Sequence, residues 1–81
     1  MLGNNSIAPS AAFGQVLRKY RQAAGFTQEQ LSLESGVQRN FISLIETGQN
    51  QPTINTIFKL ATALSQKPSR LVSDAEAIVG T

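Results

Sequence analysis

The sequence contains no cysteine and no histidine. Without cysteine, the chain has no disulfide, no thiolate metal site and no cysteine nucleophile. Without histidine, it lacks the commonest general base and a common metal ligand. It also lacks a glycine-rich phosphate loop and a clustered pair of carboxylates. These absences predict a protein that is not an enzyme and that has no cofactor and no metal site.

Long apolar runs are missing as well. No stretch approaches the roughly 18 residues that a membrane span needs. The first ten residues do not combine a basic segment with an apolar one, as a secretory signal would. We therefore expect a cytoplasmic protein with no membrane partner.

The residues that are present suit one small domain. The chain has 81 residues, of which 41% are hydrophobic, enough for a single modest core. Its net charge is only +2, but all seven basic residues precede residue 71. The modest positive potential of these residues allows contact with phosphates without requiring it. An ordinary solvated surface fits these charges almost equally well.

The hydrophobic pattern predicts an all-α fold with five short helices, because it shows helical spacing and no strand-like alternation. The sequence has no internal repeat. We expect a flexible N-terminal arm at residues 1–10, a helical domain at residues 11–73 and a C-terminal tail at residues 74–81. Whether the tail continues the fifth helix is left open by the sequence. The expected helices cover residues 11–24, 28–35, 39–47 and 54–65, and the fifth begins at Pro68.

Local signals mark several helix ends. Thr27 and Gln30 have the spacing of a capping box, and Gly36 suits a turn that requires a positive φ. Ser10 and Thr53 are expected to cap the first and fourth helices. The apolar stripe expected on the fourth helix comprises Ile54, Ile57, Phe58, Leu60, Ala61 and Leu64.

The second and third predicted helices form a recognisable unit. Small Ser32 lies where two steeply crossing helices would touch, Gly36 lies in the turn, and Ile42 and Ile45 face the core, as in a helix-turn-helix. The stretch QxxLSxxSGVxxxxIxxIExG resembles the Xre family, the phage repressor and Cro type, and is similar to small restriction–modification controllers. The resemblance implies a lambda-repressor-like domain that places its third helix in the major groove of DNA.

The outward face of the third predicted helix carries groups that suit base edges. Arginine can bond guanine O6 and N7, asparagine can bond adenine N6 and N7, and apolar groups can touch the thymine methyl. We expect Leu44 to be exposed, so that it can contact either a thymine methyl or another protein. The alternative is an ordinary solvated face. We predict base contacts by Arg39, Asn40, Ser43, Leu44 and Thr47.

Other polar residues are placed to contact the DNA backbone. Helix N-termini present free N–H groups with a partial positive charge. The amide of Gln28 can bond a phosphate or brace a side chain of the third helix. For the loop residues, ordinary loop composition is the alternative. We predict phosphate contacts by Thr27, Gln28, Phe41, Gln49, Asn50, Gln51 and Thr53.

The resemblance also implies an ion pair between Arg21 and Glu46 that orients the third helix. The alternative is two unrelated surface charges.

Helix-turn-helix proteins usually pair two units on half-sites ~34–36 Å apart, and a two-fold dimer implies a palindromic operator. The apolar residues expected to pack partly on the core and partly on a second copy are Leu71, Val72, Ala75, Ile78 and Val79.

The sequence therefore predicts a sequence-specific regulator of transcription that binds double-stranded DNA as a homodimer. It would act as a repressor or controller at promoter DNA, with RNA polymerase as a further partner if it activates. The alternative is an antitoxin that binds a toxin protein and regulates its own operon.

Overall fold

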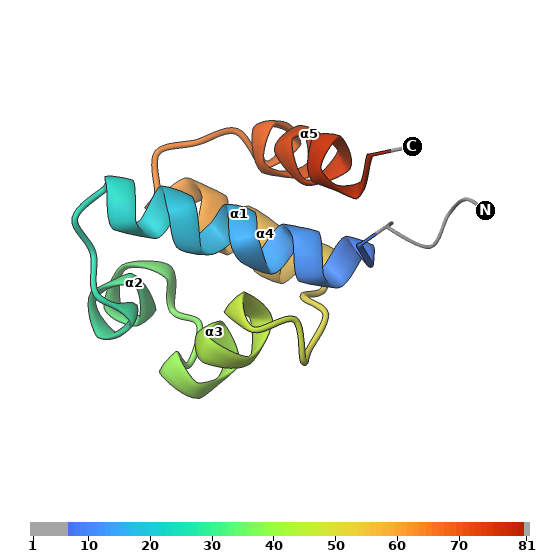
Figure 1. Cartoon of the computed structure of the whole chain (residues 1–81). Coiled ribbons are helices and arrows are strands. Elements are labelled where there is room, and N and C mark those ends of the chain that lie inside the picture. Colours follow the sequence, from blue (N-terminus) through green and yellow to red (C-terminus); the bar gives the residue numbers. More distant parts are fainter. Residues whose placement is uncertain (1–6, 81) are drawn as a thin grey trace.

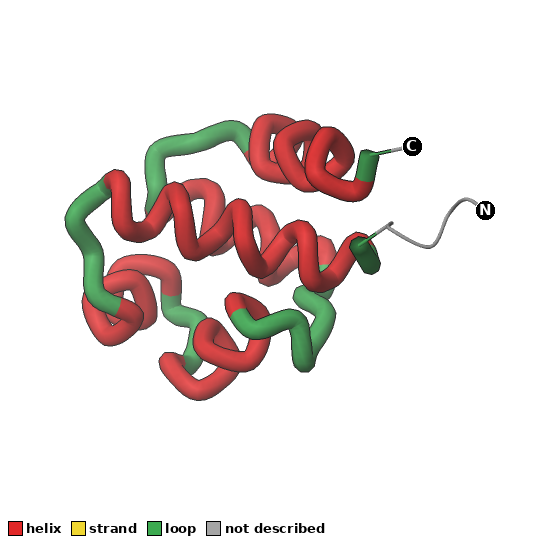
Figure 2. The backbone as a smooth tube through the Cα atoms, in the orientation of Figure 1, coloured by secondary structure: helices red, strands yellow, loops and turns green. Residues whose placement is uncertain are grey.

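A computed structural model of the chain describes residues 7–80, which fold into five helices with no strand among them (Figures 1 and 2). The predicted all-α class is therefore confirmed. No helix in this described part is long and apolar enough to cross a membrane. The helices are α1 (Pro9–Ala23), α2 (Gln28–Ser35), α3 (Arg39–Glu46), α4 (Ile54–Ala63) and α5 (Pro68–Val79).

The helix α1 organises the packing. It lies against α5 on one side and against α3 on the other, while α2 packs on α3 and on α4 (Figure 1). The helices α1, α3, α4 and α5 each turn apolar residues inward at helical spacing, whereas α2 buries only Leu31. The buried core consists of Ala12, Phe13, Val16, Leu17, Leu31, Val37, Ile42, Ile45, Leu60, Ala61, Leu64, Leu71 and Ala75.

The start of α2 follows the predicted capping box. The Thr27 hydroxyl accepts a hydrogen bond from the Gln30 N–H at 3.0 Å, and the Gln30 side chain accepts one from the Thr27 N–H at 2.8 Å. Two of the otherwise unpaired N–H groups of the helix are thereby satisfied. Gly36 then ends the helix with a φ of 78°, which turns the chain toward α3. Both predicted ends of α2 are confirmed.

The start of α1 differs from the prediction. The helix begins at Pro9 rather than residue 11, and the capping residue is Ala8, with no side-chain cap from Ser10. Proline suits the first helical position because its φ is already helical and it has no N–H to leave unpaired. The expected Ser10 cap is therefore wrong. Of the expected arm, residues 1–6 lie outside the described residues.

The apolar stripe of α4 is narrower than predicted. Thr53 caps the helix as expected, accepting a hydrogen bond from the Thr56 N–H at 3.2 Å. Ile54 and Phe58, however, are 64% and 54% exposed. These two residues are four apart and share the face that turns away from the core, whereas Leu60, Ala61 and Leu64 are buried.

The helix α5 continues through the segment that the sequence leaves open and ends at Val79. It is tied to α1 by its apolar face and by a hydrogen bond from the Tyr20 hydroxyl to the Asp74 carboxylate. This hydrogen bond raises the pKa of Tyr20, because it stabilises the neutral, donating form of the phenol. Residues 74–79 are therefore part of the helical bundle.

Candidate nucleic-acid interface

The inward side of α3 and the first turn of its outward side lie as predicted. Ile42 and Ile45 are fully buried and anchor the helix in the core. Arg39 and Asn40 are exposed in its first turn, and Ser43 is half-buried one turn later. A rigid inner side and a polar outer side allow the helix to present hydrogen-bonding groups at fixed positions.

Thr47 lies just beyond the last residue of α3 and is exposed. Its hydroxyl donates to the carbonyl oxygen of Ser43 at 3.1 Å or of Leu44 at 3.2 Å, and it accepts a hydrogen bond from the Gln49 amide at 3.0 Å. The hydroxyl is therefore committed to closing the helix end. The methyl group is the part of Thr47 that suits a base contact.

Leu44 is not exposed as expected but half-buried. It lines a surface hollow between α3 and α4, beside the half-buried ring of Phe41. The side chain is sheltered in this hollow, whose lining also includes Val37 from the turn before α3 and Thr56 and Lys59 from α4. The sequence of α3 alone does not reveal that these residues lie together. The expectation of an exposed leucine at this position was therefore wrong.

Five of the seven residues predicted to touch phosphates are either helix caps or residues of the loop after α3. Thr27 and Thr53 are helix caps, and their hydroxyls already accept hydrogen bonds from their own helices. In the loop after α3, Gln49 and Gln51 are exposed and Asn50 is half-buried. The N–H groups of residues 49 and 50 both bond to the Leu44 carbonyl oxygen, at 2.9 and 3.2 Å, which holds this loop against the end of α3.

The predicted ion pair between Arg21 and Glu46 is present. The Arg21 Nε donates to Glu46 Oε2 at 2.6 Å, and a terminal nitrogen donates to Oε1 at 3.0 Å. Only 11% and 3% of the two side chains are exposed. The carboxylate raises the pKa of the Arg21 guanidinium, because the hydrogen bonds stabilise its charged form. This bidentate pair joins α1 to the end of α3.

Two further hydrogen bonds extend this pair to the first residue of α2 and to the loop before it. Gln28 donates from its side-chain amide to Glu46 Oε1 at 3.0 Å, and the second terminal nitrogen of Arg21 donates to the Phe26 carbonyl oxygen at 2.8 Å. Of the two roles that the sequence allows for Gln28, the structure contains the bracing one. The network fixes both helices of the motif relative to α1.

Gly14, which was not among the residues singled out from the sequence, lets α1 approach α3 closely. A Cβ atom at this position would lie 2.1 Å from the carbonyl oxygen of Ile45 and 2.9 Å from that of Glu46. No side chain fits between two backbones at that separation. A glycine inside a helix costs about 1 kcal/mol relative to alanine, so its presence within the α1 pattern was the available signal.

The residues predicted to contact a second copy divide between core and surface. Leu71 and Ala75 are 0% and 7% exposed, so they are the members of this set that pack on the core, where α5 lies against α1. The contact with a second copy stays a prediction. Val72 and Ile78 are 47% and 39% exposed, and Val79 is half-buried.

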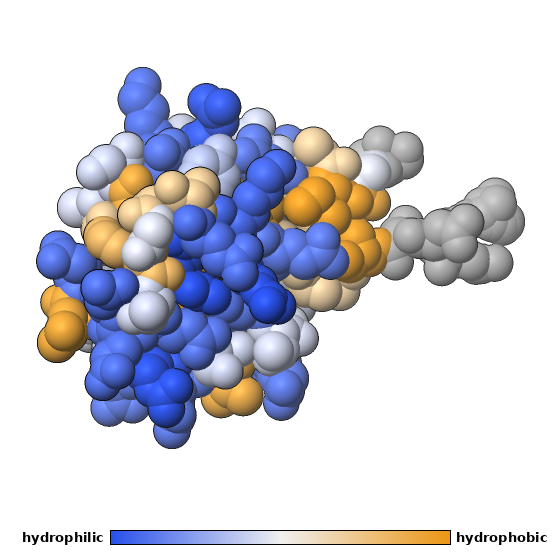
Figure 3. Space-filling view, turned by 60° about the vertical axis from the view of Figure 1, so that its left-hand side comes forward, coloured by the Kyte–Doolittle hydropathy of each residue, from blue (hydrophilic) through white to orange (hydrophobic). Residues whose placement is uncertain are grey.

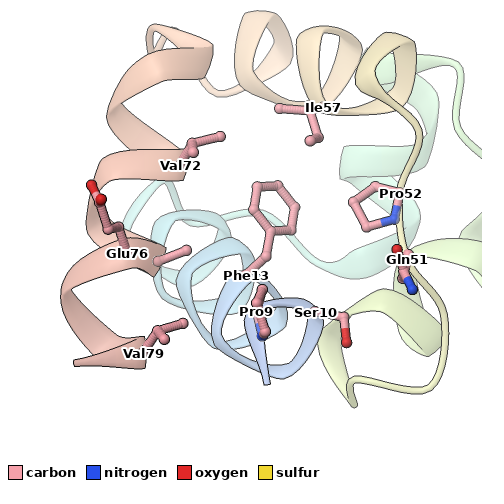
Figure 4. A pocket seen from close by; sticks show the side chains of 10 residues that line it. Pro9, Ser10, Phe13, Gln51, Pro52, Ile57, Val72, Glu76 and Val79 are labelled. Atoms are coloured by element: carbon pink, nitrogen blue, oxygen red, sulfur yellow. The ribbon is translucent and has the colours of Figure 1, made fainter. Parts of the chain in front are cut away.

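An apolar groove of about 480 Å³ runs between α5, the start of α1 and the start of α4. Phe13 projects between Val72 and Val79 on one side and Ile57 and Pro52 on the other (Figure 4). Figure 3 shows hydrophobic side chains gathered at one end of a largely hydrophilic face. This apolar groove has no α3 residue in its lining, so it is separate from the outward side of α3.

Comparisons with known proteins agree with this geometry. The profile of the helix-turn-helix family matches residues 17–71, more than half of the chain. The chain is 32% identical over 63 residues to an uncharacterized HTH-type transcriptional regulator, y4dJ, of Sinorhizobium fredii, covering 78% of this chain and 82% of that protein. It is 33% identical over 67 residues to the HTH-type transcriptional regulator SlrR of Bacillus subtilis, covering 82% of this chain but only 43% of SlrR.

Solved structures share the fold. The restriction-modification controller protein C.AhdI from Aeromonas hydrophila has a TM-score of 0.77 and 42% sequence identity, over 80% of this chain and 98% of that one. The clp gene regulator ClgR from Corynebacterium glutamicum has a TM-score of 0.87, over 95% of this chain and 99% of that one, but 21% identity, so it shows the fold alone. The chain therefore belongs to the Xre-like helix-turn-helix family of DNA-binding transcriptional regulators and is not an enzyme.

Proposed function

We propose that the protein binds a palindromic operator in double-stranded DNA as a homodimer, with α3 in the major groove. The observation that carries the proposal is the exposed pair Arg39 and Asn40 in the first turn of α3. The N-terminal residues of the second helix of this motif contact bases, and these two side chains suit guanine and adenine respectively. Ile42 and Ile45 hold the helix from behind.

The remaining contacts follow from the same placement of α3. Ser43 would face bases one turn further along, with Leu44 and the Thr47 methyl beside it. The phosphates on either side would be met by the helix starts and by the loop after α3. The proposed backbone contacts are Thr27, Gln28, Phe41, Gln49, Asn50, Gln51 and Thr53.

Between repressor and controller we favour the controller. C.AhdI is described as a restriction-modification controller protein. It is 42% identical to this chain, over 98% of the C.AhdI chain. Such a protein would occupy promoter DNA to block polymerase, or would touch RNA polymerase to activate it. The genes beside the one that encodes this chain distinguish a controller from other regulators.

Selection of bound sequences from random duplex DNA tests the proposal. We expect one enriched sequence with two half-sites related by two-fold symmetry. Replacing Arg39 or Asn40 by alanine should weaken binding to that sequence by about 1–3 kcal/mol, roughly 5- to 150-fold, and relax the preference at one base pair per half-site. Binding curves measured at fixed salt give the loss.

Arg70→Ala is the matched control for Arg39, since Arg70 is an exposed arginine on α5. It should leave the preferred sequence unchanged. Absence of any enriched sequence with the unaltered protein would overturn the proposed function. Unchanged preference in both Arg39→Ala and Asn40→Ala would refute the role of α3 while leaving DNA binding intact.

The proposed dimer uses the exposed apolar residues of α5. Replacing Val72 or Ile78 by aspartate places a charge on the surface that a second copy would bury, so dimerisation should weaken at least about tenfold. Sedimentation equilibrium measures this change. Leu33→Asp serves as the control because Leu33 is 81% exposed on α2 and should have no effect. A wild-type protein that stays monomeric at all concentrations would rule out the homodimer.

The apolar groove is also the observation that supports the antitoxin alternative. A toxin protein would bind the same surface of α5 and α1 that a second copy would cover. The other feature behind this alternative was an exposed Leu44, which is half-buried instead. We therefore rank the homodimer first.

A further inference from the structure

A second hollow lies beside the outward face of α3. Its volume is about 390 Å³, and it is formed by the turn before α3, by α3 and by α4. The apolar part is buried or half-buried, whereas most of the polar part is exposed. The apolar residues are Val37, Phe41 and Leu44, and the polar ones are Gln38, Asn40, Thr56 and Lys59, with Gly36 completing the wall.

The only charged residue lining the hollow is Lys59, which is exposed in the middle of α4. The ion pairs formed within residues 7–80 are Arg21–Glu46 and Arg70–Asp74, so Lys59 takes part in neither. No carboxylate lines the hollow to offset the ammonium charge. The site therefore combines an uncompensated positive charge with a sheltered apolar surface.

We propose that this hollow receives one deoxyribose phosphate of the DNA backbone and that Lys59 contacts its phosphate. This inference rests on the proposed function, since it requires α3 to lie in the major groove. A deoxyribose phosphate has an apolar sugar face beside an anion, and the hollow offers Phe41 and Leu44 beside Lys59. The hydroxyl of Thr56, which shares a hydrogen bond with the Thr53 hydroxyl at 3.0 Å, borders the same space.

The assignment also gives half-buried Leu44 a role besides base contact. Its side chain forms part of the apolar surface on which the sugar would lie, next to Asn40. A phosphate held by α4 and a base read by α3 would then set the register of the helix on the duplex. Phosphate contacts position a protein in this way, while base contacts supply the specificity.

Binding to a 20-base-pair duplex of arbitrary sequence, titrated with NaCl, tests the contact. Each neutralised phosphate contributes about 0.9 to the slope of log K against log salt. Lys59→Met keeps most of the apolar stem and removes the charge, so the slope should become shallower by about 0.9 for each bound copy, or about 1.8 for a dimer. The affinity advantage of the wild type should shrink about 3.5-fold for each bound copy between 50 and 200 mM NaCl, or about 12-fold for a dimer.

The matched control is Lys67→Met, which removes the same charge just before α5. Its slope should equal that of the wild type, and Lys59→Arg should restore the wild-type slope. Equal slopes for Lys59→Met and the wild type, or equal losses in both methionine variants, would overturn the contact and leave the proposed function standing. A wild-type protein that binds no duplex at low salt would overturn the proposed function itself.

Discussion

Replacing Glu46 by alanine should lower the free energy of unfolding by about 3–5 kcal/mol, because the buried Arg21 guanidinium would lose its counter-charge. Two hydrogen bonds from Arg21 and one from Gln28 end on this carboxylate. For a domain of this size, such a loss should lower Tm by roughly 12 °C or more. Urea unfolding of the purified protein measures the change.

The control for this variant is Glu34→Ala, which removes an exposed carboxylate from α2. It should change stability by no more than about 0.5 kcal/mol. A second variant, Arg21→Met with Glu46→Leu, should recover more than half of the loss, since an apolar pair avoids burying a lone charge. If Glu46→Ala is as stable as the control Glu34→Ala, the ion pair does not hold α3.

Replacing Gly14 by alanine should destabilise the protein by about 3 kcal/mol, at the upper end of the range for overpacked cores. The added Cβ would lie 2.1 Å from the Ile45 carbonyl oxygen, so either α1 or α3 must shift. The better helix propensity of alanine, worth about 1 kcal/mol, would offset only part of this cost. Thermal unfolding measures the loss, and DNA binding should fall with it because α3 is displaced.

Gln15→Ala is the neighbouring control, since Gln15 is exposed on the same helix. It should be neutral or slightly stabilising, as expected for alanine on a solvated helix face. If Gly14→Ala is as stable as Gln15→Ala, then α1 and α3 do not depend on close backbone contact. In that case the Arg21–Glu46 pair would be the main tie between the two helices.

Local chemistry explains why parts of the site could be predicted. The capping box at Thr27 and the left-handed turn at Gly36 depend on residues only a few positions apart. The opposite faces of α3 follow from helical periodicity, so Arg39 and Asn40 could be placed outward before the fold was known. The partnership of Arg21 with Glu46, by contrast, was implied by the family resemblance, because no local rule connects two residues so far apart.

The misplaced residues show where local reasoning stops. An apolar side chain can face the core, the solvent or another helix, and periodicity cannot choose between these when the stripe is broad. Ile54 and Phe58 were expected in the apolar stripe of α4 but are exposed, whereas Leu71, from a set expected to divide between the core and a second copy, is fully buried. Only the packing of α5 on α1 and of α4 on its neighbours decides these cases.

The sequence by itself determined the all-α class, the ends of α2 and the outward face of α3, since each depends on spacing within one turn or a few. The tertiary structure alone decided that Gly14 brings α1 against α3, and that Leu44 is sheltered beside Lys59. These features join segments that are distant in the chain, and their geometry depends on how whole helices pack. For that reason the bases to be read were suggested by α3 alone, while the backbone contact proposed for Lys59 required the assembled fold.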